Sequence, residues 1–146
     1  MALRHENDQS FGDSQLDIRE ELIRYSTENV YVAEKFADCV CSCGHRVFTL
    51  LMDDNTGAAA RICEKCETDH GIGDSDEYYD EAEPWLCECL CESELLEITV
   101  GVALYADSED VRWIYIGARC PACGLTGCYG DWKMQWNGYQ TLLANV

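Results

Sequence analysis

Cysteine constrains this chain more than any other residue, because eleven cysteines occur within 146 residues and eight of them form four close pairs. In each half of the chain, a Cys-x-Cys pair comes first and a Cys-x-x-Cys pair follows about one hairpin's length later. The pairs are Cys41 with Cys43, Cys63 with Cys66, Cys89 with Cys91, and Cys120 with Cys123. Four thiolates gathered from two such pairs are typical of a tetrahedral zinc site. The sequence therefore predicts two four-cysteine sites that hold two Zn²⁺.

The cysteine pattern favours metal binding over disulfides. The number of cysteines is odd, and residues Met1 to Asp8 lack the apolar run of a secretory signal peptide. We therefore expect a reducing, cytoplasmic location. No stretch approaches the roughly 18 apolar residues that a membrane-spanning helix needs, so we expect no membrane association.

Each half carries a fifth cysteine close to the others, so the choice of ligands needs an argument. In an extended strand Cys39, Cys41 and Cys43 project from one face, and either consecutive pair could close a site. Glycine follows Cys43, as glycine follows Cys123, and at such glycines backbone amides can turn toward sulfur. This favours Cys41 with Cys43, and the similarity of the two halves favours the corresponding pair in the second half.

Three cysteines, Cys39, Cys87 and Cys128, are left over. We expect them to be small, buried apolar residues. Two alternatives stay open: Cys39 or Cys87 replaces one of the proposed ligands, or a spare thiol carries redox chemistry. His45 and His70 follow the cysteine pairs of the first site and could in principle replace a sulfur, although a complete cysteine set is already present.

The two halves form an internal repeat with a period of about 50 residues. Residues 39–43 match residues 87–91 in their three alternating cysteines. Residues 60–66 match residues 117–123, and an arginine precedes each Cys-x-x-Cys pair there. A strand-turn-strand pattern separates the matched segments in both halves. An accidental pairing of cysteine motifs would seldom reproduce all of these features, so the sequence predicts a duplicated unit.

Hydrophobic patterns predict the remaining elements. Ser14 and Asp17 resemble a helix capping box, and apolar residues follow at helical spacing, which predicts a helix over residues 14–27. The predicted strands cover residues 30–37, 46–52, 58–62, 96–104, 111–116 and 129–133, residues 139–146 form a terminal helical turn, and residues 1–12 form a loose tail. The expected fold class is α+β and mostly β, with two antiparallel units and an N-terminal helix.

These elements divide the chain into four segments. Residues 1–37 form the tail and helix, residues 38–72 the first cysteine unit, residues 73–84 an acidic linker, and residues 85–146 the second unit with a C-terminal extension. Tyr78, Tyr79 and Trp85 interrupt the charge of this region, so we expect the linker to lie against the surface of the protein, with a protein-docking patch as the alternative.

The four-cysteine sets resemble tandem zinc ribbons, and Cys120-Pro121-Ala122-Cys123-Gly124 is similar to the knuckle that zinc ribbons share with rubredoxins. The resemblance covers roughly residues 39–136 and implies two zinc ribbons, each made of two knuckles and a hairpin around one Zn²⁺. Both upstream pairs are Cys-x-Cys, whereas rubredoxin uses Cys-x-x-Cys twice, which argues against an iron electron carrier. Zinc ribbons bind nucleic acids, hold complexes together or form structural inserts in enzymes, so the family implies the fold more than the task.

Charge narrows the functional classes. The chain has a formal net charge of −18, with 28 acidic and 10 basic side chains. A charge of this sign repels phosphate backbones and attracts basic surfaces, so we expect no nucleic-acid binding. The sequence therefore predicts a small acidic zinc-binding protein with structural zinc, which acts as a protein-binding or regulatory module for a basic protein surface.

Two alternative functions stay open. A thiol-based redox or transfer enzyme would use a spare cysteine. A nucleic-acid-associated zinc ribbon would need a basic stripe, whereas the predicted hairpin turns are acidic. Four thiolates leave no open coordination position for a catalytic water, so we expect no catalytic residue at the metal sites and favour a function other than catalysis.

Overall fold

Helix α1 follows directly from the start signal in the sequence. The helix spans Gln15–Glu28, Ser14 is its N-cap, and the Asp17 carboxylate accepts hydrogen bonds from the backbone N–H groups of Ser14 and Asp13. These bonds satisfy donors at the helix start that have no partner within the helix. The predicted capping box and N-terminal helix are therefore confirmed.

The computed structural model describes residues 3–53, 55–75 and 79–146. The described helices are α1, the 3-10 helix η2 (Tyr79–Glu81) and α2 (Tyr139–Leu143). The described strands are β1 (Arg4–Glu6), β2 (Gln9–Phe11), β3 (Lys35–Asp38), β4 (Phe48–Asp53), β5 (Ala58–Cys63), β6 (Asp69–Gly71), β7 (Trp85–Leu86), β8 (Glu97–Leu104), β9 (Val111–Arg119) and β10 (Leu125–Trp136). The fold is α+β and mostly β, as predicted. Asp54 of the first predicted turn and Tyr78 of the linker lie outside the described residues.

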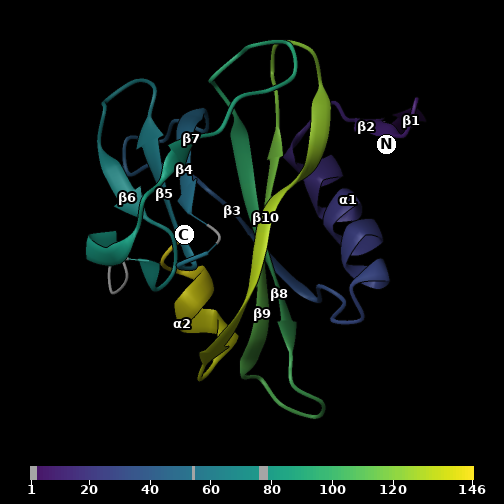
Figure 1. Cartoon of the computed structure of the whole chain (residues 1–146), viewed down its shortest axis with the longest axis vertical. Coiled ribbons are helices and arrows are strands. Elements are labelled where there is room, and N and C mark those ends of the chain that lie inside the picture. The colour runs from purple at the N-terminus through teal and green to yellow at the C-terminus, as the bar shows by residue number, and fades with distance from the viewer. Residues whose placement is uncertain (1–2, 54, 76–78) are drawn as a thin grey trace.

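The strands form two antiparallel sheets. The six-stranded sheet has the order β1-β2-β10-β9-β8-β3, and the four-stranded sheet has the order β6-β5-β4-β7. In Figure 1 the six-stranded sheet runs through the middle of the molecule, with α1 on one side and the four-stranded sheet on the other. The molecule therefore has three layers.

Side chains that alternate along the long strands place the main core between the two sheets. Val100 and Ile116 of the six-stranded sheet and Leu50 of the four-stranded sheet are fully buried in one cluster. On the opposite face of the six-stranded sheet, Tyr115 packs in a second cluster with Ile18 of α1. Because successive side chains of a strand point to opposite faces, β8 and β9 supply both clusters.

The C-terminal helical turn predicted over residues 139–146 is confirmed as α2, which buries Leu142 in the main core. Among the described residues, no helix combines the length and the apolar character needed to cross a membrane.

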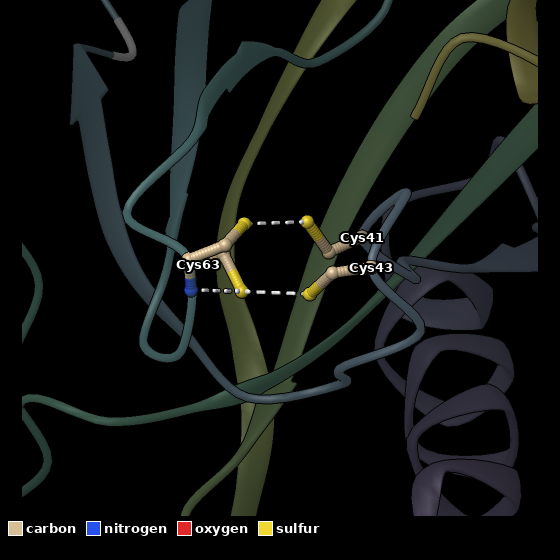
Figure 2. Close-up of side chains that lie close together, drawn as sticks. Cys41, Cys43 and Cys63 are labelled. Atoms are coloured by element: carbon tan, nitrogen blue, oxygen red, sulfur yellow. Dashed lines mark hydrogen bonds between the residues drawn. The ribbon is translucent and has the colours of Figure 1, made fainter.

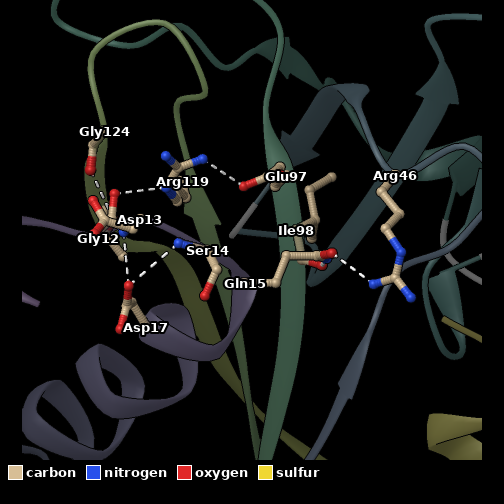
Figure 3. A network of polar contacts seen from close by, with 11 residues as sticks. Gly12, Asp13, Ser14, Gln15, Asp17, Arg46, Glu97, Ile98, Arg119 and Gly124 are labelled. Carbon is tan, nitrogen blue, oxygen red and sulfur yellow. Dashed lines mark hydrogen bonds and ion pairs between the residues drawn. The ribbon is translucent and has the colours of Figure 1, made fainter. Parts of the chain in front are cut away.

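The expectation of a loose N-terminal tail is wrong. Residues 4–6 and 9–11 form β1 and β2, and β2 pairs with β10 in the six-stranded sheet. As Figure 3 shows, the N–H of Gly12 donates to the carbonyl of Gly124 at 2.9 Å, and Nε of Arg119 donates to the carbonyl of Gly12 at 2.7 Å. These contacts use the backbone of the tail, so hydrophobic periodicity could not reveal them.

Two predicted strands differ in extent. The strand expected over residues 30–37 begins later, as β3 at Lys35. Val30 has a φ of 76°, a left-handed conformation that does not fit a strand, and the N–H of Ala33 donates to Oγ of Ser26. The strand expected over residues 129–133 is part of the longer β10, which begins at Leu125.

The structure supports the internal duplication. Strands β4, β5 and β6 of the first copy correspond to β8, β9 and β10 of the second, and corresponding strands follow in the same order in the two sheets. The offset is 48 residues before the hairpin turn, as from Cys41 to Cys89, and 57 residues after it, as from Cys63 to Cys120. The second hairpin is therefore the longer one.

Each copy gives one strand to the sheet of the other. β3 precedes the first cysteine cluster but pairs with β8, and β7 precedes the second cluster but pairs with β4. The two pairings have the same register: Asp38 lies opposite Thr99, and their counterparts Leu86 and Leu51 lie opposite each other. The exchange of strands is therefore symmetric.

A pseudo-two-fold axis passes between the copies. Phe48 and its counterpart Leu96 form a reciprocal pair, in which the N–H of each residue donates to the carbonyl of the other at 2.8 Å. Reciprocal pairing of equivalent residues is the property of a two-fold interface between identical subunits. The two copies thus contact each other as the subunits of a symmetric dimer do, although they belong to one chain.

The division of the chain into residues 1–37, 38–72, 73–84 and 85–146 stays a prediction. The exchanged strands β3 and β7 pair across these predicted boundaries. β3 spans the first of these boundaries and pairs with the second unit, and β7 begins the last segment and pairs with the first unit. Both units also contribute to one hydrophobic cluster, so they share a core.

The arginines that precede the two Cys-x-x-Cys pairs are not equivalent. By strand register, Arg61 corresponds to Ala118, and Arg119 corresponds to Ile62. Arg61 is buried, with its guanidinium 4.6 Å from the ring centre of Phe48, whereas Arg119 points to the opposite side of its sheet. A shift of one residue along a strand reverses the face, so this similarity in the sequence does not reflect a shared role.

Candidate metal centres

Each cysteine cluster forms where two tight turns face each other at the end of a hairpin. In each cluster the four sulfur atoms lie within 4.8 Å of one another. The first cluster is Cys41, Cys43, Cys63 and Cys66, and the second is Cys89, Cys91, Cys120 and Cys123. The structure therefore brings together the same eight cysteines that the sequence singles out, in the same two groups.

The distances between sulfur atoms fit one tetrahedral ion per cluster. Sγ of Cys41 lies 3.4 Å from that of Cys66, and Sγ of Cys43 lies 3.7 Å from that of Cys63 (Figure 2). The corresponding distances in the second cluster are 3.4 and 3.6 Å. Zinc–sulfur bonds of about 2.3 Å place tetrahedral sulfurs about 3.8 Å apart, whereas a disulfide is about 2.05 Å long. The thiols are free, and each donor set fits a metal ion.

The four tight turns share one backbone geometry. In each turn, the residue after the second cysteine has a positive φ, and its N–H donates to the carbonyl of the first cysteine of the pair. These residues are Gly44 (91°), Glu67 (62°), Glu92 (76°) and Gly124 (85°). The turn aims backbone N–H groups at sulfur, as where the N–H of Cys66 points at Sγ of Cys63 at 3.5 Å. Hydrogen bonds of this kind favour the thiolate, which is the form that binds metal.

Each cluster has a buried side and an exposed side. The first cysteine of every pair is buried and the second is exposed. Thr68 contacts the exposed side of the first cluster: its Oγ1 lies 3.2 Å from Sγ of Cys66, and this hydrogen bond holds the pKa of the Cys66 thiol below its ordinary value. Thr68 was missed by the sequence reasoning, although a hydroxyl two residues after the last cysteine was a signal for it.

The three spare cysteines stay outside both clusters. Burial raises the pKa of the Cys39 thiol to about 12 and that of the Cys87 thiol to about 11, and burial also raises the pKa of Cys128. Cys39 and Cys87 lie in the main core, as expected, whereas Cys128 is half-buried and its Sγ donates to the carbonyl of Gly130. Since the thiolate is the strong nucleophile, a raised pKa does not favour a nucleophilic role for these three thiols at neutral pH.

The two histidines near the first cluster have other partners. Nε2 of His45 lies 2.8 Å from a carboxylate oxygen of Glu64, and Nε2 of His70 lies 3.0 Å from the carbonyl of Asn145. Neither histidine belongs to a cluster of metal-binding side chains within the part of the chain that the structure describes. The option in which a histidine replaces a sulfur therefore has no support.

The four-cysteine sites are suited to holding two turns together, not to catalysis at the metal. Four thiolates complete a tetrahedral shell and leave no position for a water or substrate, and they donate enough charge to make the ion a weak Lewis acid. An ion in the first cluster would tie the turn before β4 to the turn after β5, and an ion in the second would do the same for β8 and β9. The geometry thus supports structural metal binding.

The chain was compared with models of protein families, with curated proteins and with solved structures, and none of the three comparisons found a match. The fold and the two cysteine clusters define the class of protein: a small, acidic, mostly β protein with an internal duplication and two four-cysteine sites suited to a structural metal ion.

Proposed function

We propose that this chain is a tandem zinc-ribbon protein with two structural Zn²⁺, and that the loaded protein acts as a protein-binding or regulatory module for a basic partner. The observation that carries the proposal is the pair of closed four-sulfur clusters, which are equivalent in spacing, burial and turn geometry. Cys41, Cys43, Cys63 and Cys66 would hold one ion, and Cys89, Cys91, Cys120 and Cys123 the other.

Zinc is favoured over iron by the combination of donors and turns. Four thiolates in a tetrahedron suit zinc and also iron, so geometry alone does not choose between them. Zinc has no redox chemistry, and a site with a purely structural role suits it. A zinc ribbon is expected to have one knuckle before the first strand of a hairpin and one after the second strand, and both copies have this arrangement.

A basic partner is favoured by charge. The net charge of −18 gives the protein a negative field that would speed its encounter with a basic surface. Thirteen acidic residues and one lysine lie between Glu64 and Glu97, a stretch that includes η2, β6 and β7. The same field disfavours nucleic acids, which would need a basic stripe.

Thiol chemistry is the weaker candidate. Each spare cysteine has a raised pKa, whereas a working thiol nucleophile has a lowered one. In the zinc-loaded protein we expect iodoacetamide to react slowly with Cys39, Cys87 and Cys128 at neutral pH. A single fast-reacting thiol in the loaded protein would instead favour a redox or transfer enzyme.

Eleven free thiols suit a cytoplasmic protein, and this location also stays a proposal. The direct test of the function is to purify the tagged chain at low salt, identify the proteins that co-purify by mass spectrometry, and measure their binding as salt rises. We expect a basic partner whose affinity falls with salt, mostly through the association rate. An acidic partner, or binding that does not depend on salt, would contradict the proposed role of charge.

A further inference from the structure

The strands of the two copies correspond, but the outer sheet edges of the two copies differ. In the six-stranded sheet, the outer edge of β10 is covered by β2. The counterpart of β10 in the four-stranded sheet is β6, and among the described residues no strand pairs with its outer edge. Figure 1 shows β6 at the side of the molecule, away from the six-stranded sheet. One copy therefore shows a strand docked at a position that the other leaves open.

The two edges have the same register. Asp69 lies opposite Ile62, and at an offset of 57 residues Thr126 lies opposite Arg119. The first hydrogen bond of each pairing is also equivalent, because the N–H of Cys63 donates to the carbonyl of Thr68 as the N–H of Cys120 does to that of Leu125. Equivalent residues of β6 and β10 thus point their backbone groups in equivalent directions.

The backbone groups that receive β2 have counterparts on β6. In an antiparallel ladder alternate residues point their N–H and C=O groups away from the neighbouring strand. On β10, the outward-pointing residue Thr126 pairs with Ser10 of β2. The carbonyl of Gly124, two residues earlier, accepts a hydrogen bond from the N–H of Gly12. The corresponding groups are the backbone N–H and C=O of Asp69 and the carbonyl of Glu67. An extended segment docked there would make the bonds that β2 makes in the other copy.

The side chains around the β6 edge define the chemistry of that segment. Glu67, Asp69 and Asp80 are exposed carboxylates. Beside the β6 edge is a hollow of about 300 Å³ that is lined by both apolar and polar residues: Leu51, Ala60, Ile62, Asp69, His70, Gly71 and Asp80. A hollow that combines apolar side chains such as Leu51 and Ile62 with the carboxylates of Asp69 and Asp80 suits lysine or arginine, whose aliphatic stems pack on apolar surface while the charged group meets a carboxylate.

We propose that the outer edge of β6 is the docking site for an extended basic segment of the partner protein, which adds to the four-stranded sheet as an antiparallel strand. This inference rests on the proposed function, because it assumes a basic partner. Strand addition derives affinity from backbone hydrogen bonds and specificity from side-chain pockets, and both are present here.

A second copy of this chain fits the edge poorly. Pairing β6 with β6 of another molecule would bring two sets of Glu67, Asp69 and Asp80 together, and like charges close to each other destabilise strand pairing. Short, charged edge strands are a common protection against such self-association. A basic segment would attract these carboxylates instead of repelling them. Electrostatics therefore favours a basic partner over a second copy of this chain at the β6 edge.

The experiment uses the full zinc-loaded chain and a short peptide of alternating lysine and valine with blocked ends. Binding is followed by amide chemical shifts and by hydrogen exchange. We expect salt-sensitive binding, with the largest shifts on β6 and slower exchange of the Asp69 and Gly71 amides. The same peptide with N-methyl groups on alternate residues has the same charge but lacks ladder donors, and it should bind about tenfold more weakly.

Two variants locate the site. Asp69→Pro removes an outward donor that β5 does not use, so it should weaken the intact peptide about tenfold while zinc content stays at the wild-type level. Asp107→Asn is the matched control for charge: Asp107 is exposed in the β8–β9 turn with a φ of 55°, which asparagine tolerates, so binding should change less than about twofold.

The possible outcomes separate this inference from the function on which it rests. If binding is salt-sensitive but neither N-methylation of the peptide nor Asp69→Pro weakens it, the docking site is wrong, although a basic partner is still supported. Amide chemical-shift changes confined to a surface other than β6 would lead to the same conclusion. Dimers that form without peptide and are lost in Asp69→Pro would show that the edge binds a second copy, which would overturn the proposal. If no basic peptide binds at low salt, both the docking site and the charge-driven function fail.

Discussion

At both candidate centres, the residue that follows each cysteine pair decides the shape of the turn. Two of these residues, Gly44 and Gly124, are glycines, and they guided the choice of ligands in the sequence. The other two, Glu67 and Glu92, have the same left-handed backbone without being glycine. Glycine therefore revealed half of the turns, and the two glutamates could be recognised only from the hydrogen-bonded geometry that they share.

A substitution at one glutamate tests this backbone geometry. A left-handed conformation costs a non-glycine residue about 1 kcal/mol or more, and the greater flexibility of glycine in the unfolded chain offsets part of that cost. We expect Glu92→Gly to raise the free energy of unfolding of the zinc-loaded protein by about 0.5 kcal/mol, measured by urea denaturation. Glu94→Gly is the control, because Glu94 has no positive φ and its replacement should give no gain.

The ligand assignment is tested by one pair of cysteines in the same region of the second copy. Cys123→Ser should remove a ligand and lower the zinc content of the protein, since a structural site contributes on the order of 10 kcal/mol of binding free energy. Cys128→Ser should keep two zinc ions, because Cys128 lies outside the cluster and a hydroxyl can also donate to the carbonyl of Gly130. Elemental analysis of the purified proteins distinguishes them, and equal metal loss from both would show that the ligands are wrongly assigned.

At the scale of elements, the sequence predicts well what is local. The helix over residues 14–27, the two hairpins and the terminal turn follow from capping residues and from apolar periodicity, and the structure confirms them. It predicts poorly what depends on a distant partner. β1 and β2 form because β10 offers an edge, and β3 and β7 pair with the other copy, which no local pattern of residues encodes.

The packing of α1 on the six-stranded sheet depends on a glycine. A Cβ atom at Gly117 of β9 would lie 2.5 Å from a methyl carbon of Ile18 and 3.0 Å from the side chain of Leu22. We expect Gly117→Ala to push α1 away from the sheet and to lower the free energy of unfolding by about 1–3 kcal/mol. Gly127→Ala on the neighbouring strand β10 is the matched control, because a Cβ there meets no atom within 4 Å and should change stability by less than about 1 kcal/mol.

Measurement of thermal unfolding at saturating zinc gives both values. A Gly117→Ala protein as stable as the Gly127→Ala protein would contradict the close contact between α1 and β9.

At the scale of the whole molecule, the exchanged strands join the two sites. Each copy completes the sheet of the other, and both copies share one hydrophobic cluster, so neither half has a complete set of strands of its own. Removal of one zinc ion should therefore lower the affinity of the other site for its zinc ion, so the two sites are coupled. In a titration of the loaded protein with chelator, we expect the two-zinc and zinc-free forms to dominate at every step. An abundant, folded one-zinc form would show that the sites are independent.

Native mass spectrometry of the purified chain shows directly whether two closed sites each hold one structural zinc ion. The technique counts the metal ions on each folded molecule and identifies them by mass. We expect two zinc ions per chain and little iron, because eight thiolates in two tetrahedral clusters leave no other complete site among the described residues. A folded chain that carries iron, a single zinc ion or no metal would contradict this expectation.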